Sequence, residues 1–205
     1  IEYFQKDGAD GTIKNPYVIT SIEDLEKIRE IVNSGYGLSG INFKLIADLS
    51  LPSDWEPIGN LKEDFTVTLP DGTVIESENN GANVNPFMGI FDGNSHKITI
   101  PTNGCGIFKY VRKAVIKNLN VYGERIKGSA LVCKDFVDYG SSGDYNKTRV
   151  THTVTIDNCR LLAGSKTTGA GFIRGSGSGS NNVYILNSVI EKGVVIGCDG
   201  PTTAG

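Results

Sequence analysis

The sequence has 205 residues, of which 39% are hydrophobic and 21% are charged, and this composition excludes a disordered chain. Its formal net charge is −3 and its basic residues form no stripe, so we expect no nucleic-acid partner. No apolar run approaches the roughly 18 residues that a membrane-spanning helix needs. We expect a single domain over residues 1–205 with a sizeable core.

The first residues, IEYFQKDG, contain no methionine, and the only methionine of the chain is Met88. This favours a processed or trimmed chain, produced by removal of a signal peptide or by a boundary set within a longer sequence. The last apolar run, VVIG, lies close to the end of the sequence. It fits either a natural end or a cut through a longer array.

An amphipathic helix is predicted over residues 22–33. Ser21 and Asp24 have the spacing of a capping box, and Gly35 supplies a stop. The apolar residues of one helix face are Leu25, Ile28, Ile31 and Val32. We expect this helix, with its caps at about 21–34, to cover the N-terminal end of a β core, because open strand edges invite aggregation. Packing against the side of a sheet is the alternative.

The rest of the chain has the pattern of strands and turns. Runs typical of β-strands cover residues 43–51, 89–100 and 106–121, and they are broken by Gly, Asn, Asp and Pro. Asp92-Gly93-Asn94 is a strong turn signal. Gly precedes a bulky apolar pair three times, at residues 89–91, 106–108 and 171–173.

Three asparagines recur inside strand-like segments. Asn118, Asn158 and Asn187 share a pattern in which an apolar residue lies two positions before the Asn, a small or apolar residue follows it, and an apolar residue lies three positions after it. Self-similarity at a few tens of residues is typical of a solenoid. Asn tolerates the left-handed backbone that a sharp corner needs. In stacked layers, each Asn amide could also form hydrogen bonds with its neighbours in the stack and with the corner backbone. Ordinary turns of a β-sandwich are the alternative reading of the three asparagines.

We therefore predict an all-β chain folded as a right-handed parallel β-helix, a solenoid with an N-terminal amphipathic capping helix. Leu119, Cys159 and Ser188 would then form one interior row, which buries Cys159 as an unpaired thiol. The other cysteines are Cys105, Cys133 and Cys198. No CxxC pair exists and only two histidines are present, so we expect buried thiols and no metal site.

A resemblance to a known family is carried by motifs in a fixed order over residues 11–125. They are Gly11-Thr12, Asn15-Pro16-Tyr17-Val18-Ile19, Asp24-Leu25, Phe43-Lys44-Leu45, Ala47-Asp48-Leu49, Trp55-Glu56-Pro57-Ile58-Gly59, Gly89-Ile90-Phe91-Asp92-Gly93-Asn94-Ser95-His96-Lys97-Ile98 and Ile116-Lys117-Asn118-Leu119. The chain resembles the GLUG-repeat adhesin-like β-helices of bacterial cell surfaces, which also occur in the N-terminal regions of some IgA-specific metallopeptidases. The resemblance implies a right-handed β-helix, export and a cell-surface setting. It does not imply peptidase activity, since the chain has no HExxH motif.

The acidic residues are the candidates for catalysis, because β-helices often carry polysaccharide enzymes. A glycosidase needs two carboxylates about 5–10 Å apart. Asp157 points outward, but the matching positions hold Lys117 and Leu186, so no acidic row forms. A lyase would need acids that bind Ca²⁺ and a basic residue nearby, which Asp135, Asp138 and Asp144 with Lys147 and Arg149 could supply. The alternative, which we favour, is a solvated polar loop, and we expect no catalytic residue, cofactor or metal.

Two insertions are the best candidates for binding, because loops on rigid scaffolds usually carry function. One covers residues 60–86, with Asp71-Gly72 as a hairpin turn, and the other covers residues 135–153. The second combines aromatic and polar residues as sugar sites do. Its candidate ligand-binding residues are Tyr139, Asp144, Tyr145, Arg149 and His152. Tyrosines that only hold the loop in place are the alternative.

The sequence thus predicts a secreted or cell-surface module that is adhesive or glycan-binding and not catalytic. Its partners would be host or bacterial glycans or surface proteins. Two other functions stay open: a β-helix polysaccharide lyase or glycoside hydrolase, and a structural stalk segment of a larger surface protein.

Overall fold

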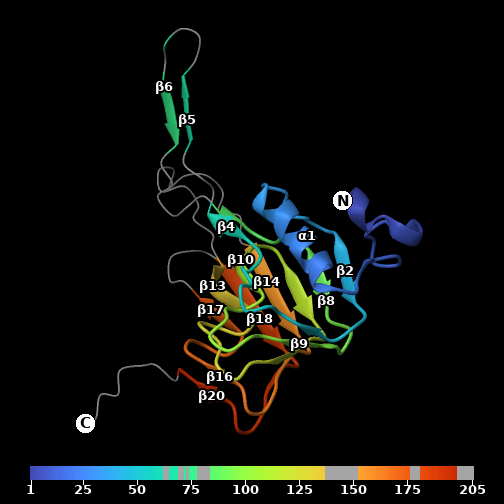
Figure 1. Cartoon of the computed structure of the whole chain (residues 1–205), viewed down its shortest axis with the longest axis vertical. Helices are drawn as coiled ribbons and strands as arrows, with labels where there is room; N and C mark the ends of the chain where they lie inside the picture. The colour runs from blue at the N-terminus through green and yellow to red at the C-terminus, as the bar shows by residue number, and fades with distance from the viewer. Residues whose placement is uncertain are drawn as a thin grey trace.

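The computed structural model describes residues 1–61, 65–68, 72, 74–77, 84–136, 152–175 and 181–197. Most of these residues lie in or between short strands, and one α-helix, α1 (Ile22–Asn33), lies near the N-terminus (Figure 1). Two short 3-10 turns, Glu2–Phe4 and Lys6–Gly8, precede the first strand. Among the described residues the fold is therefore mostly parallel β-sheet with a single α-helix.

The strands form three main parallel sheets. The first sheet has the spatial order β1 (Tyr17–Ile19), β2 (Asn42–Leu45), β8 (Ile90–Asp92), β11 (Val115–Lys117), β14 (His152–Asp157) and β18 (Asn181–Leu186). The second has the order β3 (Leu49–Ser50), β9 (Lys97–Thr99), β12 (Asn120–Tyr122), β15 (Arg160–Leu161) and β19 (Val189–Ile190). The third contains β10 (Phe108–Val111), β13 (Val132–Phe136) and β17 (Ile173–Gly175). Strands β16 (Lys166–Thr167) and β20 (Val195–Ile196) form a further parallel pair.

Successive strands of the chain visit these sheets in turn. From β8 onward the chain gives one strand to the first sheet, one to the second and one to the third, and then begins again with β11 in the first sheet. Neighbouring strands of one sheet therefore come from segments that lie a few tens of residues apart in the sequence. The predicted parallel β architecture is confirmed at this level, and the three strand-like runs of the sequence each supply strands to it.

Apolar side chains at matching positions form two inner rows. The inner row of the first sheet is Tyr17, Phe43, Phe91, Ile116, Ile156 and Ile185. The inner row of the second sheet is Leu49, Ile98, Val121, Leu161 and Ile190. All members are buried except the last of each row, since Ile185 is 51% exposed and Ile190 is 42% exposed. The core thus runs through the stack of strands and is open at the β18–β19 end.

The predicted helix is confirmed, together with its caps. Ser21 Oγ accepts a hydrogen bond from the backbone N–H of Asp24 at 3.3 Å, and the Asp24 carboxylate accepts from the backbone N–H of Ser21 at 3.0 Å. Leu25, Ile28 and Val32 are completely buried in the same core as Tyr17 and Phe43, and Ile31 is partly buried against it. Helix α1 joins β1 to β2 in the chain. In Figure 1, α1 and β2 lie on the far side of the molecule from β20.

A charge on the buried face of α1 is expected to cause aggregation. Ile28→Asp places a carboxylate in the core and loosens the helix from the sheet edge, which exposes unpaired strand backbone. We expect light scattering and size-exclusion chromatography to detect soluble aggregates of this variant. Glu23→Ala, on the exposed face of the same helix, should behave like the parent chain. A monomeric and fully soluble Ile28→Asp variant would contradict this role of the helix.

Two antiparallel pairs lie within the predicted insertion 60–86. Strand β4 (Asn60–Leu61) pairs with β7 (Val84–Asn85), and β5 (Phe65–Thr68) pairs with β6 (Val74–Ser77). The β5–β6 pair confirms the hairpin predicted from Asp71-Gly72. At its base, Asn85 Nδ2 donates to the Asn33 carbonyl oxygen at 2.9 Å and to Asn60 Oδ1 at 2.8 Å. These bonds tie the insertion to the C-terminal end of α1.

The second predicted insertion, residues 135–153, begins and ends within strands of the described structure. Residues Asp135 and Phe136 belong to β13, where they pair with Tyr110 and Val111 of β10. At the other end His152 and Thr153 belong to β14 and pair with Asn181 and Asn182 of β18. The polar composition of these residues suggested a loop, but their backbone hydrogen bonds extend the parallel sheets.

Candidate functional site

The asparagine pattern produces a polar ladder where the first sheet turns into the second. Asn118, Asn158 and Asn187 each follow the last residue of a first-sheet strand and have positive φ angles of 52°, 51° and 48°. Gly93 occupies the equivalent place after β8. A Cβ on Gly93 would lie 2.6 Å from both the Asn118 carbonyl oxygen and Leu119 Cα, so only glycine fits there. The predicted equivalence of the three asparagines is confirmed.

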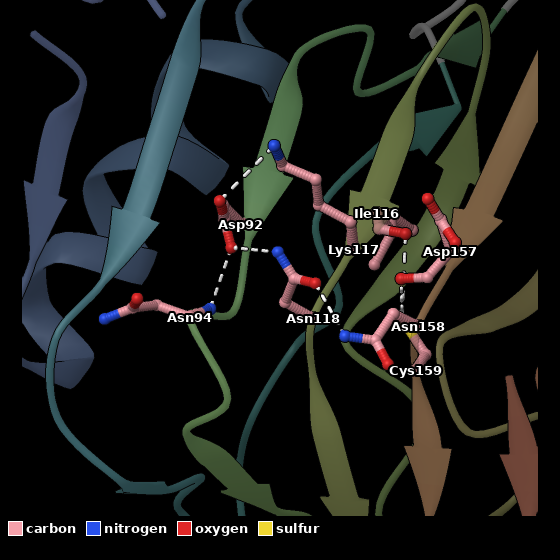
Figure 2. A network of polar contacts seen from close by, with 8 residues as sticks. All are labelled: Asp92, Asn94, Ile116, Lys117, Asn118, Asp157, Asn158 and Cys159. Carbon is pink, nitrogen blue, oxygen red and sulfur yellow. Dashed lines mark hydrogen bonds and ion pairs between the residues drawn. The ribbon is translucent and has the colours of Figure 1, made fainter. Parts of the chain in front are cut away.

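Side-chain amides connect the steps of the ladder (Figure 2). Asn118 Nδ2 donates to Asp92 Oδ1 at 2.9 Å, and Asn158 Nδ2 donates to Asn118 Oδ1 at 2.8 Å. Asn187 Nδ2 donates to Asp157 Oδ1 at 2.8 Å. Its partner is therefore Asp157 and not the neighbouring Asn158, which the asparagine stack predicts. The ladder therefore combines asparagine and aspartate side chains, and the roles of Asp92 and Asp157 in it are not predicted by the asparagine pattern.

The outer face beside the ladder carries charges of alternating sign. Lys44, Asp92, Lys117 and Asp157 are paired in that order on adjacent strands. Lys117 Nζ lies 3.4 Å from Asp92 Oδ2 (Figure 2). Each of the two aspartates thus lies next to a strand that carries a lysine at the paired position, and one strand separates Asp92 from Asp157. This row is suited to mutual neutralisation of charge.

Asp92 is held in its ionised form. Partial burial disfavours the carboxylate, but hydrogen bonds from Asn118 and from the backbone N–H of Asn94, together with Lys117, outweigh this and lower its pKa. A general acid needs a shift in the opposite direction. Asp92 is therefore suited to a structural role in the ladder.

Acid titration tests the role of Asp92. Because its pKa is lowered in the folded state, its contribution to stability is complete above the ordinary aspartate pKa of 3.8 and is lost as the pH falls through the folded value. We expect Asp92→Asn to be less stable than the parent chain near neutral pH, and the difference to shrink below pH 3.8. Urea unfolding at a series of pH values measures this difference. Asp54→Asn, in an exposed turn, controls for the loss of one carboxylate. A difference that stays constant with pH would contradict the assignment.

Leu119 and Cys159 follow the ladder residues and point into the core, as the predicted interior row requires. Both are completely buried, and Cys159 is a free thiol. Its Sγ lies 3.6 Å from the carbonyl oxygens of Ile116 and Asp157. Ser188, the third member, is only half-buried, and its Oγ accepts from the backbone N–H of Cys159 at 3.0 Å.

Thiol labelling distinguishes the two described cysteine side chains. Burial raises the pKa of Cys159 to about 11, so its thiolate is scarce and inaccessible, whereas Cys105 is partly exposed. We expect iodoacetamide to modify Cys105 under native conditions at least about tenfold faster than Cys159, because only the thiolate reacts. Peptide mapping by mass spectrometry gives both rates, and labelling after denaturation is the control. Equal native rates would contradict the interior position of Cys159.

Most of the predicted ligand-binding residues lie outside the part of the chain that the structure describes. Tyr139, Asp144, Tyr145 and Arg149 lie outside the described residues, as do Asp138 and Lys147 of the possible lyase site. His152 begins β14, where its backbone is paired with Asn181. Among the residues that are described, no three His, Cys, Asp or Glu side chains are grouped so that they could hold a metal ion.

Comparison with known proteins gives one distant relative. The chain is 26% identical over 133 residues to a protein of Evansella cellulosilytica named "Putative Gly-rich membrane protein". The match covers 58% of this chain, and the chain spans only 12% of the length of that relative. No family model matches the sequence. No solved structure matches it either. The resemblance to GLUG-repeat adhesin-like proteins accordingly stays a prediction.

The relative corrects the predicted location. Its name points to a membrane location and contradicts the predicted secreted or cell-surface setting. That prediction depended on the family resemblance and on the missing initial methionine. Within the described parts of the chain, no helix has both the length and the apolar character needed to cross a membrane.

Proposed function

We propose that the chain is a non-catalytic, glycan-binding module built on a right-handed parallel β-helix. The support for the β-helix is the regular visit of the chain to the three sheets and the two inner rows that run through them. In such a scaffold each turn of the chain contributes one layer, and α1 closes the first layer. The resemblance to the adhesin-like β-helices agrees with this proposal.

The observation that carries the binding proposal is the placement of β13 and β14, the strands on either side of residues 137–151 in the sequence. This segment connects β13 to β14, and each of these is an interior strand with a parallel neighbour on both sides. The strands that flank this segment are thus fixed within their sheets, and connections between strands of a rigid scaffold commonly carry binding residues. Its sequence carries Tyr139, Asp144, Tyr145 and Arg149, which can offer ring faces and charged hydrogen-bonding groups to a sugar.

We propose further that the module belongs to a membrane-associated protein. The support is the name of the Evansella relative, which is several times longer than this chain. A single module of this kind is expected to bind a glycan weakly, and several copies on one surface would raise the effective affinity.

Glycan binding and turnover can be tested together. The purified chain is screened on a glycan array and is incubated with neutral and uronic-acid polysaccharides, with and without Ca²⁺. We expect binding that Tyr139→Ala or Tyr145→Ala weakens by about 1–2 kcal/mol, the scale of one lost ring contact. Tyr36→Ala, an exposed tyrosine remote in sequence from the loop, is the control. New reducing or unsaturated ends would instead favour a hydrolase or a lyase.

A structural segment of a longer protein is the second candidate function. It is favoured by the exposed apolar side chains of β18, β19 and β20, because the end of a stalk segment would be covered by whatever follows it. A chain that binds no glycan on the array, while unfolding cooperatively as a stable domain, would support this function over the first.

A further inference from the structure

One side of the strand stack, between the second and third sheets, carries a cluster of basic side chains. Three segments from successive layers lie next to one another there, namely residues 103–105, 125–127 and 166–168. Two parallel pairs fix their register, Cys105 with Lys127 and Ile126 with Thr167. Ile126 and Thr167 are completely buried, so the residues on either side of them point outward.

The outward positions form a grid of six residues, which we name the basic face. They are Asn103, Cys105, Arg125, Lys127, Lys166 and Thr168. Arg125 and Lys166 are in register on neighbouring segments, about 4.8 Å apart, and Lys127 lies roughly 7 Å further along the segment from Arg125. Three cations are thus grouped in a grid that holds no acidic residue. Glu124, which precedes Arg125, accepts a hydrogen bond from Thr102 Oγ1 at 3.2 Å.

The charges of the basic face are not balanced in the way found on the first sheet. There, basic and acidic residues alternate from strand to strand, and Lys117 Nζ lies 3.4 Å from Asp92 Oδ2. Here Arg125 is in register with Lys166, and like charges on neighbouring strands repel each other. Lys127 and Lys166 are exposed, and within the described residues neither ammonium group is paired with a carboxylate. An anion bound from solution would offset this repulsion.

The groups beside the three cations are of the kinds that bind sugars. The ring of Tyr122 is half-buried and lies over the corner before Lys166, because a Cβ on Gly164 would be 3.6 Å from its Cε2 atom. A tyrosine ring offers a face to the C–H surface of a sugar. Asn103 and Thr168 add an amide and a hydroxyl group that can bond sugar hydroxyls. The ligand chemistry that fits this surface is therefore a sugar that carries negative charge.

We propose that the basic face binds an acidic polysaccharide through the carboxylates of its uronic-acid residues. Guanidinium and ammonium groups form charge-assisted hydrogen bonds with carboxylates. A polymer with a carboxylate on every sugar can contact cations of two neighbouring layers at once, whereas a small anion would reach fewer of them. The basic face consists of described residues and is separate in sequence from residues 137–151. The inference therefore assigns a second site with its own ligand class and does not rest on the binding proposed for that segment.

The test is the binding of oligogalacturonate to the whole chain, with its methyl ester as the uncharged control ligand. Isothermal titration calorimetry should show binding of the acid that added salt weakens, and little binding of the ester. We expect Lys127→Gln combined with Lys166→Gln to raise the dissociation constant at least about tenfold, because two charge-assisted contacts are lost. Lys6→Gln combined with Lys14→Gln removes the same charge from exposed turns near the N-terminus and should change the constant little.

Three outcomes would overturn the proposal. The first is an absence of oligogalacturonate binding by the parent chain. The second is binding that the Lys127 and Lys166 substitutions leave unchanged; if Tyr139→Ala abolishes it instead, the ligand belongs to residues 137–151. The third is equally tight binding of polyglutamate, because charge alone would then explain the affinity. Urea unfolding of both double variants checks that they keep the stability of the parent, and the ester and salt comparisons on the parent chain need no variant.

Discussion

Replacing Ile156 with alanine is expected to lower the free energy of unfolding by about 2–5 kcal/mol, the range for truncating a buried isoleucine. Ile156 lies in the inner row of the first sheet and is completely buried between Ile116 and Ile185. Its loss would leave a cavity between two layers of the core, and rigid strands on both sides would prevent the space from closing.

The matched control is the same substitution one layer further along. Ile185 has the same side chain in the same row but is 51% exposed, so Ile185→Ala should cost less than about 1 kcal/mol. Urea unfolding measures both values. Equal costs at the two positions would contradict the description of β18 as an uncovered layer.

Replacing Asn118 with alanine is expected to cost about 2–4 kcal/mol. The substitution removes two hydrogen bonds, from Asn118 to Asp92 and from Asn158 to Asn118, and leaves both partners without that contact. It also places alanine at a φ of 52°. This left-handed conformation costs about 1–2 kcal/mol for L-residues other than Asn and Asp.

Asn118→Gly separates the two contributions. Glycine adopts positive φ without strain, so this variant should recover about 1 kcal/mol relative to alanine while still lacking the amide. Asn187→Ala should cost less than Asn118→Ala, because Asn187 is exposed and accepts no bond from a following asparagine in the described structure. Thermal or urea unfolding gives all three values. Alanine and glycine variants of equal stability would show that the left-handed backbone is not what asparagine provides here.

The sequence predicted the features that depend on local chemistry. The capping box of Ser21 and Asp24 and the apolar face of α1 follow from helical spacing, and the structure has both. The recurrence of Asn118, Asn158 and Asn187 predicted the bends, because few residues accept a positive φ. Burial of Cys159 then followed from its position after the second asparagine.

The features that were missed depend on register between distant strands. Asp92 was interpreted only as part of a turn, because nothing local shows that Asn118 lies beside it. The alternating row of Lys44, Asp92, Lys117 and Asp157 has no regular spacing in the sequence, since the connecting segments differ in length. The predicted glycan-binding residues cannot be compared in this way, because Tyr139, Asp144, Tyr145 and Arg149 lie outside the described residues.

Parallel register between segments about forty residues apart is the central claim, and an engineered disulfide tests it most directly. Lys117 and Asp157 are directly paired on β11 and β14, and paired residues on adjacent strands lie within the roughly 4.4–6.8 Å Cα separation that a disulfide bridges. Val115 is two residues out of register with Asp157, at roughly 7–8 Å. After mild oxidation and peptide mapping, Lys117→Cys with Asp157→Cys should form a nearly complete cross-link, and Val115→Cys with Asp157→Cys should form little. Equal cross-linking, or a preference for the second pair, would contradict the stacked parallel arrangement.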